Sequence, residues 1–263
     1  MSGYVDLHNH ILHNIDDGPG TLNESVLLAR ALVETGYSKV VVTPHVVEGK
    51  PAPQQILKRL RELQQEIDRN QIKLTLLPGS EHHIEPLILE RLENNESLTL
   101  AGSRYLLLEL PFNQPLPLYT EQLIYNLSAK GYCAVIPHPE RALALQNDHR
   151  LIHHLHDLGA IYQLTWGALT GRLGPRPEKT ARYMVKANLA HLFATDAHHF
   201  AGRLQEVEKG AARLAELLGS DKVDPFLRER PLAVINDQPL NLEPADKPLL
   251  QKSKKFIFFK RSH

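Results

Sequence analysis

Histidine and carboxylate residues recur in this sequence at spacings suited to binding metal ions. His8 and His10 are two residues apart, as are Asp196 and His198. Alternate side chains of a β-strand project to the same side, so each pair presents two donor atoms on one face of a strand. Imidazole and carboxylate donors without thiolate suit Mn²⁺, Fe²⁺ or Zn²⁺ and disfavour a soft-metal site. These pairs therefore point to metal chemistry.

The elements that must position these residues alternate between strand and helix along the chain. Apolar runs predict strands, and amphipathic patterns with a period near 3.6 residues predict the helices between them. Thr21 and Glu24 form a capping-box pattern at the start of the first helix, and Gly36 ends it. Seven strands are expected, at 4–11, 39–47, 73–78, 105–110, 132–137, 160–166 and 189–195. The later helices are expected at 53–70, 86–94, 118–130, 148–158, 177–188 and 203–218.

This alternation, with short connections, implies an α/β fold in which helices cover a parallel sheet. For a chain of 263 residues, we favour a closed or nearly closed (β/α)7 TIM-like barrel. An open, doubly wound sheet is the alternative. The domain is expected to span residues 1–245, followed by a basic, aromatic tail at 246–263.

Ionisable residues gather at the carboxyl ends of the expected strands, the face that carries active sites in parallel β/α folds. Six of the seven strands bring metal-ligand types to that face. A carboxylate such as Glu109, at the end of an apolar run, would be costly to bury without a cation. The candidates are His8, His10, Asp16, Asp17, His45, Glu81, Glu109, His138, Glu140, Asp196 and His198, with Arg141 and Arg203 beside them.

Several of these features have an ordinary explanation when taken alone. His45 could be a hydrogen-bonded core histidine, and Glu81 could cap a helix. The run from Asp16 to Pro19 could be only a turn. Their occurrence at the same end of so many strands favours a site that binds more than one metal ion.

Composition excludes other classes of protein. Lys and Arg number 30, as do Asp and Glu, so the net charge is zero and binding to nucleic acid is not expected. The single cysteine, Cys133, excludes a disulfide framework, and Pro139 six residues later excludes a Cys-x5-Arg phosphatase motif. The sequence has neither an apolar run long enough for a membrane span nor a signal-peptide pattern at its amino terminus. We therefore expect a cytoplasmic enzyme.

Seven segments together resemble the polymerase-and-histidinol-phosphatase (PHP) superfamily: DLHNHIL, DDGP, TPHV, GSEHHI, LLLEL, HPER and TDAH. Within it, DDGP, HPER and the late Gly202-Arg203 pair are similar to bacterial manganese-dependent protein-tyrosine phosphatases of capsule and exopolysaccharide operons. The resemblance runs over residues 4–236 and implies a distorted seven-stranded barrel that binds three metal ions. It implies phosphate contacts by Arg141 and Arg203, and as metal ligands His8, His10, Asp17, His45, Glu81, Glu109, His138, Asp196 and His198.

Charge arithmetic is compatible with a phosphate substrate. Three divalent ions and four carboxylates leave a charge of about +2, which two arginines raise toward +4. The resulting hypothesis is that a metal-bridging hydroxide hydrolyses phosphotyrosine on a bacterial tyrosine kinase, with Mn²⁺ the expected metal and Fe or Zn possible.

Other functions compete with this hypothesis. A small-molecule phosphomonoesterase, such as a histidinol-phosphate phosphatase, is the main alternative, and a metal-binding scaffold without catalysis is a weaker one. A zinc amidohydrolase also begins with paired histidines, but Glu109, His198 and the two arginines fit phosphate better than an amide.

The segment 247–263 differs from the rest of the chain. It carries six Lys and Arg residues, no acidic residue, and the cluster Phe256-Ile257-Phe258-Phe259. This composition suits contact with an anionic membrane or a membrane-bound kinase. A frayed terminus, or a strand packed on the barrel, is the alternative.

Overall fold

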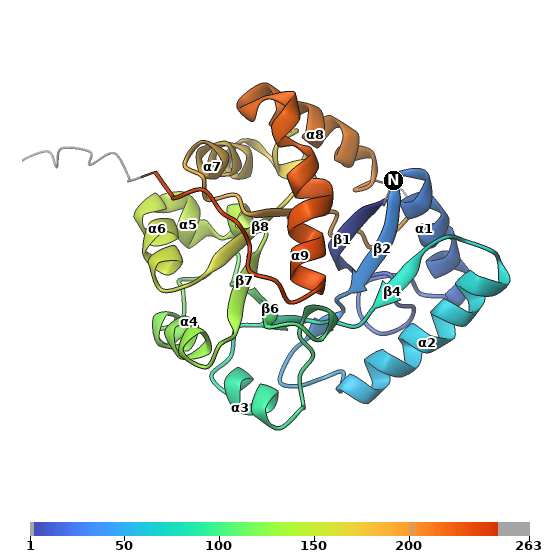
Figure 1. Ribbon diagram of the computed structural model, residues 1–263. Coiled ribbons are helices and arrows are strands. Elements are labelled where there is room, and N and C mark those ends of the chain that lie inside the picture. Colours follow the sequence, from blue (N-terminus) through green and yellow to red (C-terminus); the bar gives the residue numbers. More distant parts are fainter. Residues whose placement is uncertain (1–2, 201, 247–263) are drawn as a thin grey trace, which may run out of the picture.

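Helices surround a central group of parallel strands in the computed structural model, which describes residues 3–200 and 202–246 (Figure 1). The strands are β1 (Tyr4–Asn9), β2 (Tyr37–Val42), β3 (His45–Val46), β4 (Thr75–Leu77), β5 (Glu81–His83), β6 (Tyr105–Glu109), β7 (Cys133–Pro137), β8 (Ile161–Thr165) and β9 (Leu192–Ala194). The helices are α1 (Leu22–Glu34), α2 (Pro53–Arg69), α3 (Ile88–Glu93), α4 (Thr120–Ala129), α5 (Leu143–Asn147), α6 (His149–Asp157), α7 (Pro175–Lys186), α8 (Gln205–Leu218) and α9 (Arg230–Ile235).

The described strands form two parallel sheets, with the orders β1-β2-β4 and β3-β5-β6-β7-β8-β9. The expected strand 39–47 is divided into β2 and β3, and β4, in the expected strand 73–78, is followed by a further short strand, β5. Pro44 lies at the first break and Pro78-Gly79 at the second. Proline has no N–H to donate to a ladder, so it interrupts a strand at such a point. The fold is therefore α/β with parallel sheets, as expected, although hydrogen bonds between the described strands do not close them into one barrel.

Two apolar cores hold the strands in place. The larger core lies between the strands and the outer helices, and it includes Leu28, Ile56 and Tyr162. The smaller core gathers side chains from the other face of the strands, such as Leu7 and Leu107. Val234 of α9 packs into the smaller core, and Figure 1 shows α9 lying across the strands.

The segment that contains α9 covers the amino ends of the strands. The hydroxyl of Tyr105, the first residue of β6, donates a hydrogen bond to the Gln238 carbonyl at 2.7 Å. Arg230 donates one to the carbonyl of His191, directly before β9, at 3.0 Å. Because the strands are parallel, their carboxyl ends lie together at the opposite end, which leaves that end available for a site.

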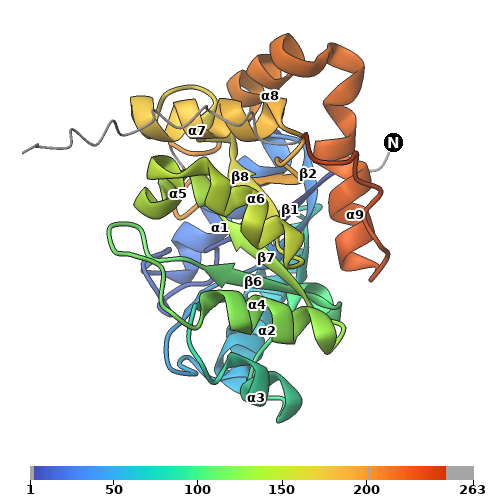
Figure 2. The same ribbon diagram turned by 90° about the vertical axis from the view of Figure 1, so that its left-hand side faces the viewer.

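The local signals in the sequence mark several helices correctly. Thr21 and Glu24 form the predicted capping box of α1: the Thr21 side chain accepts from the Glu24 N–H, and the Glu24 side chain accepts from the Thr21 N–H. Helices α4, α5 and α6 lie along one side of the strands (Figure 2). The short helices α5 and α9 were not expected, because each is only one or two turns long and the hydrophobic period needs a longer segment to emerge.

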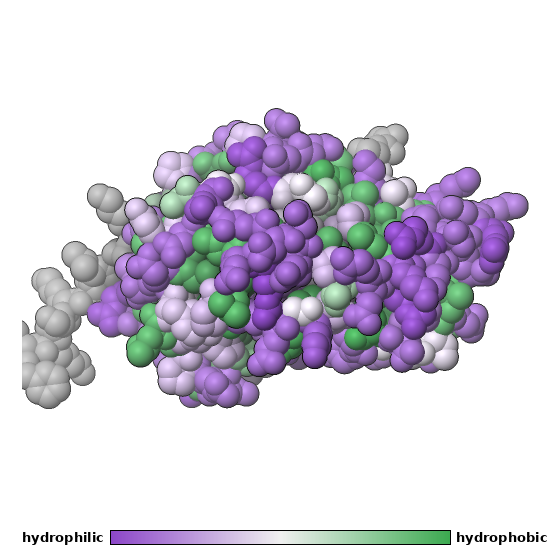
Figure 3. Space-filling view, turned by 90° about the horizontal axis from the view of Figure 1, so that it is seen from below, coloured by the Kyte–Doolittle hydropathy of each residue, from purple (hydrophilic) through white to green (hydrophobic). Residues whose placement is uncertain are grey.

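The outer surface is mixed in polarity. The face in Figure 3 carries hydrophilic residues interspersed with small hydrophobic groups, a distribution ordinary for a protein surface. Within the described ranges, no helix combines the length and apolarity that crossing a membrane requires. The proposed contact tail at 247–263 lies outside the described residues.

Candidate metal centre

The carboxyl ends of the longer strands, together with the short strands β3 and β5, bring all nine predicted metal ligands into one cluster. His8 lies in β1 and Glu109 ends β6, while His45 and Glu81 begin the short strands β3 and β5. The remaining ligands stand on the loops that follow β1, β7 and β9: His10, Asp17, His138, Asp196 and His198. The breaks at Pro44 and Pro78-Gly79 therefore have a consequence for the site, because each is followed by a short strand that begins with a candidate ligand.

Four donor atoms gather near the end of β1. The Nε2 atoms of His8 and His10 are 3.1 Å apart. Each lies 3.3 Å from Glu81 Oε2 and 3.5 Å from Asp196 Oδ1. Ligands that each lie about 2.1 Å from a shared ion are about 3.0–3.4 Å apart. His8, His10 and Glu81 are thus spaced as the ligands of a single cation, and Asp196 lies beside the two histidines.

Glu81 also takes part in a second group of donors. Its other oxygen, Oε1, lies 2.9 Å from His138 Nε2, which is 3.6 Å from Glu109 Oε1. The two oxygens of this one carboxylate therefore face different sets of ligands. Such an arrangement suits a carboxylate that bridges two cations.

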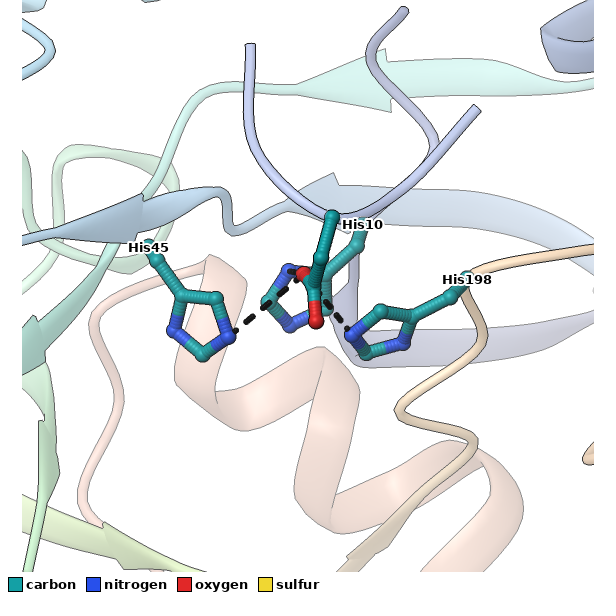
Figure 4. A group of neighbouring side chains, drawn as sticks. His10, His45 and His198 are labelled. Atoms are coloured by element: carbon teal, nitrogen blue, oxygen red, sulfur yellow. Dashed lines mark ion pairs between the residues drawn. The ribbon is translucent and has the colours of Figure 1, made fainter. Parts of the chain in front are cut away.

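A third group surrounds Asp17, on the loop after β1. Asp17 Oδ1 lies 3.1 Å from His198 Nε2 and 3.7 Å from His45 Nε2. Figure 4 shows the rings of His10, His45 and His198 turned toward one another. Their donor atoms form one group with that of Asp17. Asp17 is the most exposed member, with 65% of its side chain accessible, so this group stands at the open side of the cluster.

The chemistry of the cluster fits bound cations. Glu81 Oε2 and His45 Nδ1 are buried and lie 2.9 Å apart, but neither has a hydrogen-bond partner of good geometry in the described part of the chain. Burial opposes ionisation of Glu81, but His8 and His10 outweigh it and hold the pKa of Glu81 well below its usual range. Four carboxylates packed together need compensating positive charge.

The pKa of His10 reflects the same need for positive charge beside the carboxylates. Burial alone would lower the pKa of His10, but the contacts with Asp16 and Glu81 raise it to about 10. A proton on this ring therefore compensates the carboxylates when no cation does. Because a metal ligand must be deprotonated, cation binding would release this proton.

Residues outside the nine predicted ligands orient the ligand rings. His8 Nδ1 bonds to Gln163 Oε1 at 2.9 Å, and His10 Nδ1 bonds to Asp16 Oδ2 at 2.7 Å. Each of these contacts leaves the opposite ring nitrogen, Nε2, directed at the cluster, which is the usual role of an outer partner of a metal-binding histidine. Asp16 therefore orients His10, while Asp17 faces the third group. Gln163 lies inside an apolar strand, and no local pattern in the sequence marks it.

His83 is a further donor at the edge of the cluster. Its Nε2 lies 2.8 Å from Glu109 Oε2, and His45, His83 and Glu109 form another set of neighbouring donor atoms. The sequence indicates that His83 can join the cluster, because His83 and Glu81 are two residues apart along β5 and so project to the same side.

Backbone strain accompanies the placement of two ligands. His138 and Asp196 have φ angles of 34° and 51°, in the left-handed region that residues other than glycine rarely adopt. Each such residue costs about 1–3 kcal/mol, which surrounding structure must offset. Other described residues, such as Gln71 and Ala101, adopt the same region, so the strain alone does not mark the site.

The two predicted arginines approach the cluster through Asp196. Arg203 forms an ion pair with Asp196 Oδ2 and donates to the Asp196 carbonyl, while Arg141 Nη1 lies 3.6 Å from the same oxygen. Arg141 also stacks over the Phe112 ring, 4.0 Å from its centroid. Burial would raise the pKa of Asp196, but the charges of His8 and Arg203 lower it to about 2. Both guanidinium groups remain about one-third exposed and can reach a ligand.

Two other ionisable residues stand apart from the donor groups. Burial raises the pKa of Cys133 to about 12, so its thiol does not form the thiolate that a nucleophile needs. Glu140, the remaining acidic candidate, is fully buried and turned away: its Oε1 accepts hydrogen bonds from the N–H and hydroxyl of Thr165 at 3.1 and 2.9 Å. Glu140 thus secures the turn between His138 and Arg141.

The fold and this cluster define an α/β protein with a candidate metal-binding site at the carboxyl ends of its parallel strands. A family model described as "Capsular polysaccharide synthesis, CpsB/CapC" matches residues 4–236. The chain belongs to this family.

Relatives of known name support this assignment. The chain is 33% identical to the tyrosine-protein phosphatase YwqE of Bacillus subtilis over 257 residues, which cover 97% of this chain and all of YwqE. It is 28% identical to the tyrosine-protein phosphatase CpsB of Streptococcus pneumoniae, covering 89% of this chain and 99% of CpsB. A crystal structure described as one of YwqE and CpsB, "unique metal-dependent tyrosine phosphatases", matches with a TM-score of 0.88 at 32% identity, covering 93% of this chain and 99% of that one.

Proposed function

We propose that this protein is a metal-dependent protein-tyrosine phosphatase that acts on a bacterial tyrosine kinase in capsule or exopolysaccharide synthesis. The observation that carries the proposal is the three groups of donor atoms beside two arginines. The names of YwqE and CpsB support the same activity. The kinase partner, and with it a cytoplasmic location, follow from the proposed role.

Three divalent ions are proposed to occupy the cluster, with Mn²⁺ expected and Fe²⁺ or Zn²⁺ as alternatives. His8, His10, Glu81 and Asp196 would hold the first ion. Glu81, Glu109 and His138 would hold the second, and Asp17, His45 and His198 the third. The spacing of the donor atoms supports this division.

The remaining side chains would bind and orient the phosphoryl group. Bound divalent ions supply Lewis acidity and lower the pKa of water toward neutrality. Arg141 and Arg203 present forked donors that suit phosphate oxygens. Asp196 holds the guanidinium of Arg203, and the Phe112 ring supports that of Arg141. A phenolate leaving group, with a pKa near 10, needs less help from an acid than an alkoxide does.

The scaffold we propose is a distorted seven-stranded barrel formed by residues 1–245. In this interpretation, β2 with β3 and β4 with β5 are single strands interrupted by proline. The parallel bridge between Asn9 and Ala197, which joins the end of β1 to the segment after β9, supports closure. The two sheets on either side of the breaks would then form the continuous wall of one barrel.

Phosphate release from a phosphotyrosyl peptide tests the function. We expect hydrolysis that a chelator abolishes and Mn²⁺ restores, and His138→Ala should abolish it in the metal-supplied protein. Arg141→Ala should lower kcat and raise KM together, because this residue would contact the phosphoryl group in both the bound substrate and the transition state. Failure to hydrolyse the peptide, with rapid hydrolysis of histidinol phosphate, would contradict the assignment and move the substrate to a small phosphoester.

A further inference from the structure

A third arginine, Arg172, lines the same small cavity as Arg141 and Arg203. The cavity opens beside Asp196, at the carboxyl ends of β8 and β9. Arg172 stands on the loop between β8 and α7, 31 residues away in sequence from both of the other arginines. Neither spacing nor motif marks this residue.

The loop that carries Arg172 is anchored on both sides of it. Leu169 is fully buried and Leu173 packs against the larger core. Between them, the Thr170 hydroxyl bonds to the carboxylate of Glu206 in α8 and, at 3.0 Å, to the Gly167 carbonyl. Arg172 is exposed, but the backbone that positions it is not free to move far.

Two glycines make room for the side chain of Arg172. Its Cδ lies 3.3 Å from the position that a Cβ at Gly167 would take, and its Nη2 lies 3.1 Å from the corresponding position at Gly202. Gly202 also has a φ of +99°, which favours glycine. The side chain of Arg172 thus extends from Gly167 to Gly202. Its guanidinium lies beside Gly202, the residue before Arg203.

The acidic side chains of the cavity contact residues other than Arg172. Arg203 is paired with Asp196, and Arg141 approaches the same carboxylate. Glu206, the other acid lining the cavity, is engaged by Thr170 and lies 3.6 Å from Lys209. Arg172 has neither an ion pair nor a side-chain hydrogen bond within residues 3–200 and 202–246. Its donors are therefore available to an anion from solution.

We propose that Arg172 forms a subsite for a second anionic group of the substrate, next to the phosphoryl group bound by Arg141 and Arg203. This inference rests on the proposed function. The planar guanidinium fork suits a carboxylate or a phosphate. The substrate class is then a phosphotyrosyl peptide with a neighbouring anion, which is either an acidic side chain or a second phosphotyrosine.

Four substrates with the metal-loaded protein separate the alternatives. They are p-nitrophenyl phosphate, a phosphotyrosyl peptide with neutral neighbours, the same peptide with aspartates beside the phosphotyrosine, and the same peptide with a second phosphotyrosine. Arg172→Ala should lower kcat/KM about 10- to 100-fold for the peptides that carry the second anion, mainly through KM. It should change the values for the other two substrates less than about twofold.

Two further variants make the test specific. Arg172→Lys keeps the charge without the fork and should recover part of the loss. Arg176→Ala removes a nearby exposed arginine at the start of α7 and should leave all four values unchanged. The two anionic peptides distinguish carboxylate from phosphate as the preferred second group.

The outcomes distinguish this inference from the proposed function. A similar loss on all four substrates would place Arg172 on the transferred phosphoryl group and overturn the subsite, as would no selective loss at all. Binding of fluorescently labelled peptides, measured by anisotropy, repeats the comparison without turnover. Absence of hydrolysis by the wild-type protein therefore contradicts the proposed function, whereas absence of Arg172-dependent selectivity in binding contradicts the subsite.

Discussion

Replacing Glu81 with glutamine should remove two of the three proposed ions. Glu81 is fully buried. One of its oxygens lies 3.3 Å from the Nε2 atoms of His8 and His10, and the other lies 2.9 Å from that of His138. Glutamine keeps the shape of the side chain, but it loses the charge and replaces one ligand oxygen with an NH₂ group. The change therefore affects both groups of donors that share this carboxylate.

The size of the effect follows from the burial of the carboxylate. Removing one partner of a buried ion pair costs about 3–5 kcal/mol. At about 1.4 kcal/mol for each factor of ten, this cost corresponds to roughly a 100- to 4,000-fold loss of metal affinity. The third group, around Asp17, touches Glu81 through His45 Nδ1, 2.9 Å away, but the Nε2 atom of His45 faces Asp17. This group should therefore keep its ion.

Metal content measures this prediction directly. Wild-type and Glu81→Gln proteins are loaded with Mn²⁺, passed through a desalting column and analysed by mass spectrometry, and their affinities are measured by titration calorimetry. Glu140→Gln is the matched control, because Glu140 is equally buried near the site but faces Thr165. The reasoning is refuted if Glu81→Gln keeps the full metal content at nearly the wild-type affinity, or if Glu140→Gln loses as much metal.

Two further predictions concern stability. Burial lowers the pKa of His191 from 6.5 to about 3, so between these values the unfolded chain binds the extra proton and stability falls as the pH falls, by up to about 1.4 kcal/mol per pH unit. His191→Asn keeps an acceptor for the Tyr162 N–H but cannot titrate. Urea unfolding of the metal-free proteins at pH 7 and pH 5 should therefore show a smaller loss of unfolding free energy for the variant than for the wild type. Equal losses would count against this explanation. Gly210→Ala in α8 should destabilise the fold by about 1–3 kcal/mol despite the better helix propensity of alanine, because the new Cβ would lie 2.6 Å from the Trp166 carbonyl oxygen. Lys209→Ala, at a more exposed neighbour, should change the free energy of unfolding by no more than about 0.5 kcal/mol, and a Gly210→Ala protein as stable as the wild type would show that the helix can shift.

Local signals were sufficient to predict the alternation of strands and helices. The capping box of Thr21 and Glu24 depends on neighbours three residues apart, and the structure confirms it. The candidate ligands are predictable because hydrophobic runs mark where strands end and because parallel strands end on one face. The sequence does not indicate the short helix α9, since it spans only six residues and its packing into the smaller core depends on strands far away in the sequence.

The sequence by itself determined which donor types are present and at which strand ends, because strand periodicity and residue chemistry are local properties. Only the tertiary structure decided how those donors are grouped. In the folded protein, the two oxygens of Glu81 face different partners, and Gln163 contacts His8. Asp16 contacts His10, whereas Asp17 lies beside His198. The tertiary structure also brings Arg172 to the side of the two predicted arginines. These placements depend on how distant strands and loops pack together, and the distance between two side chains in space is not encoded in their separation along the chain.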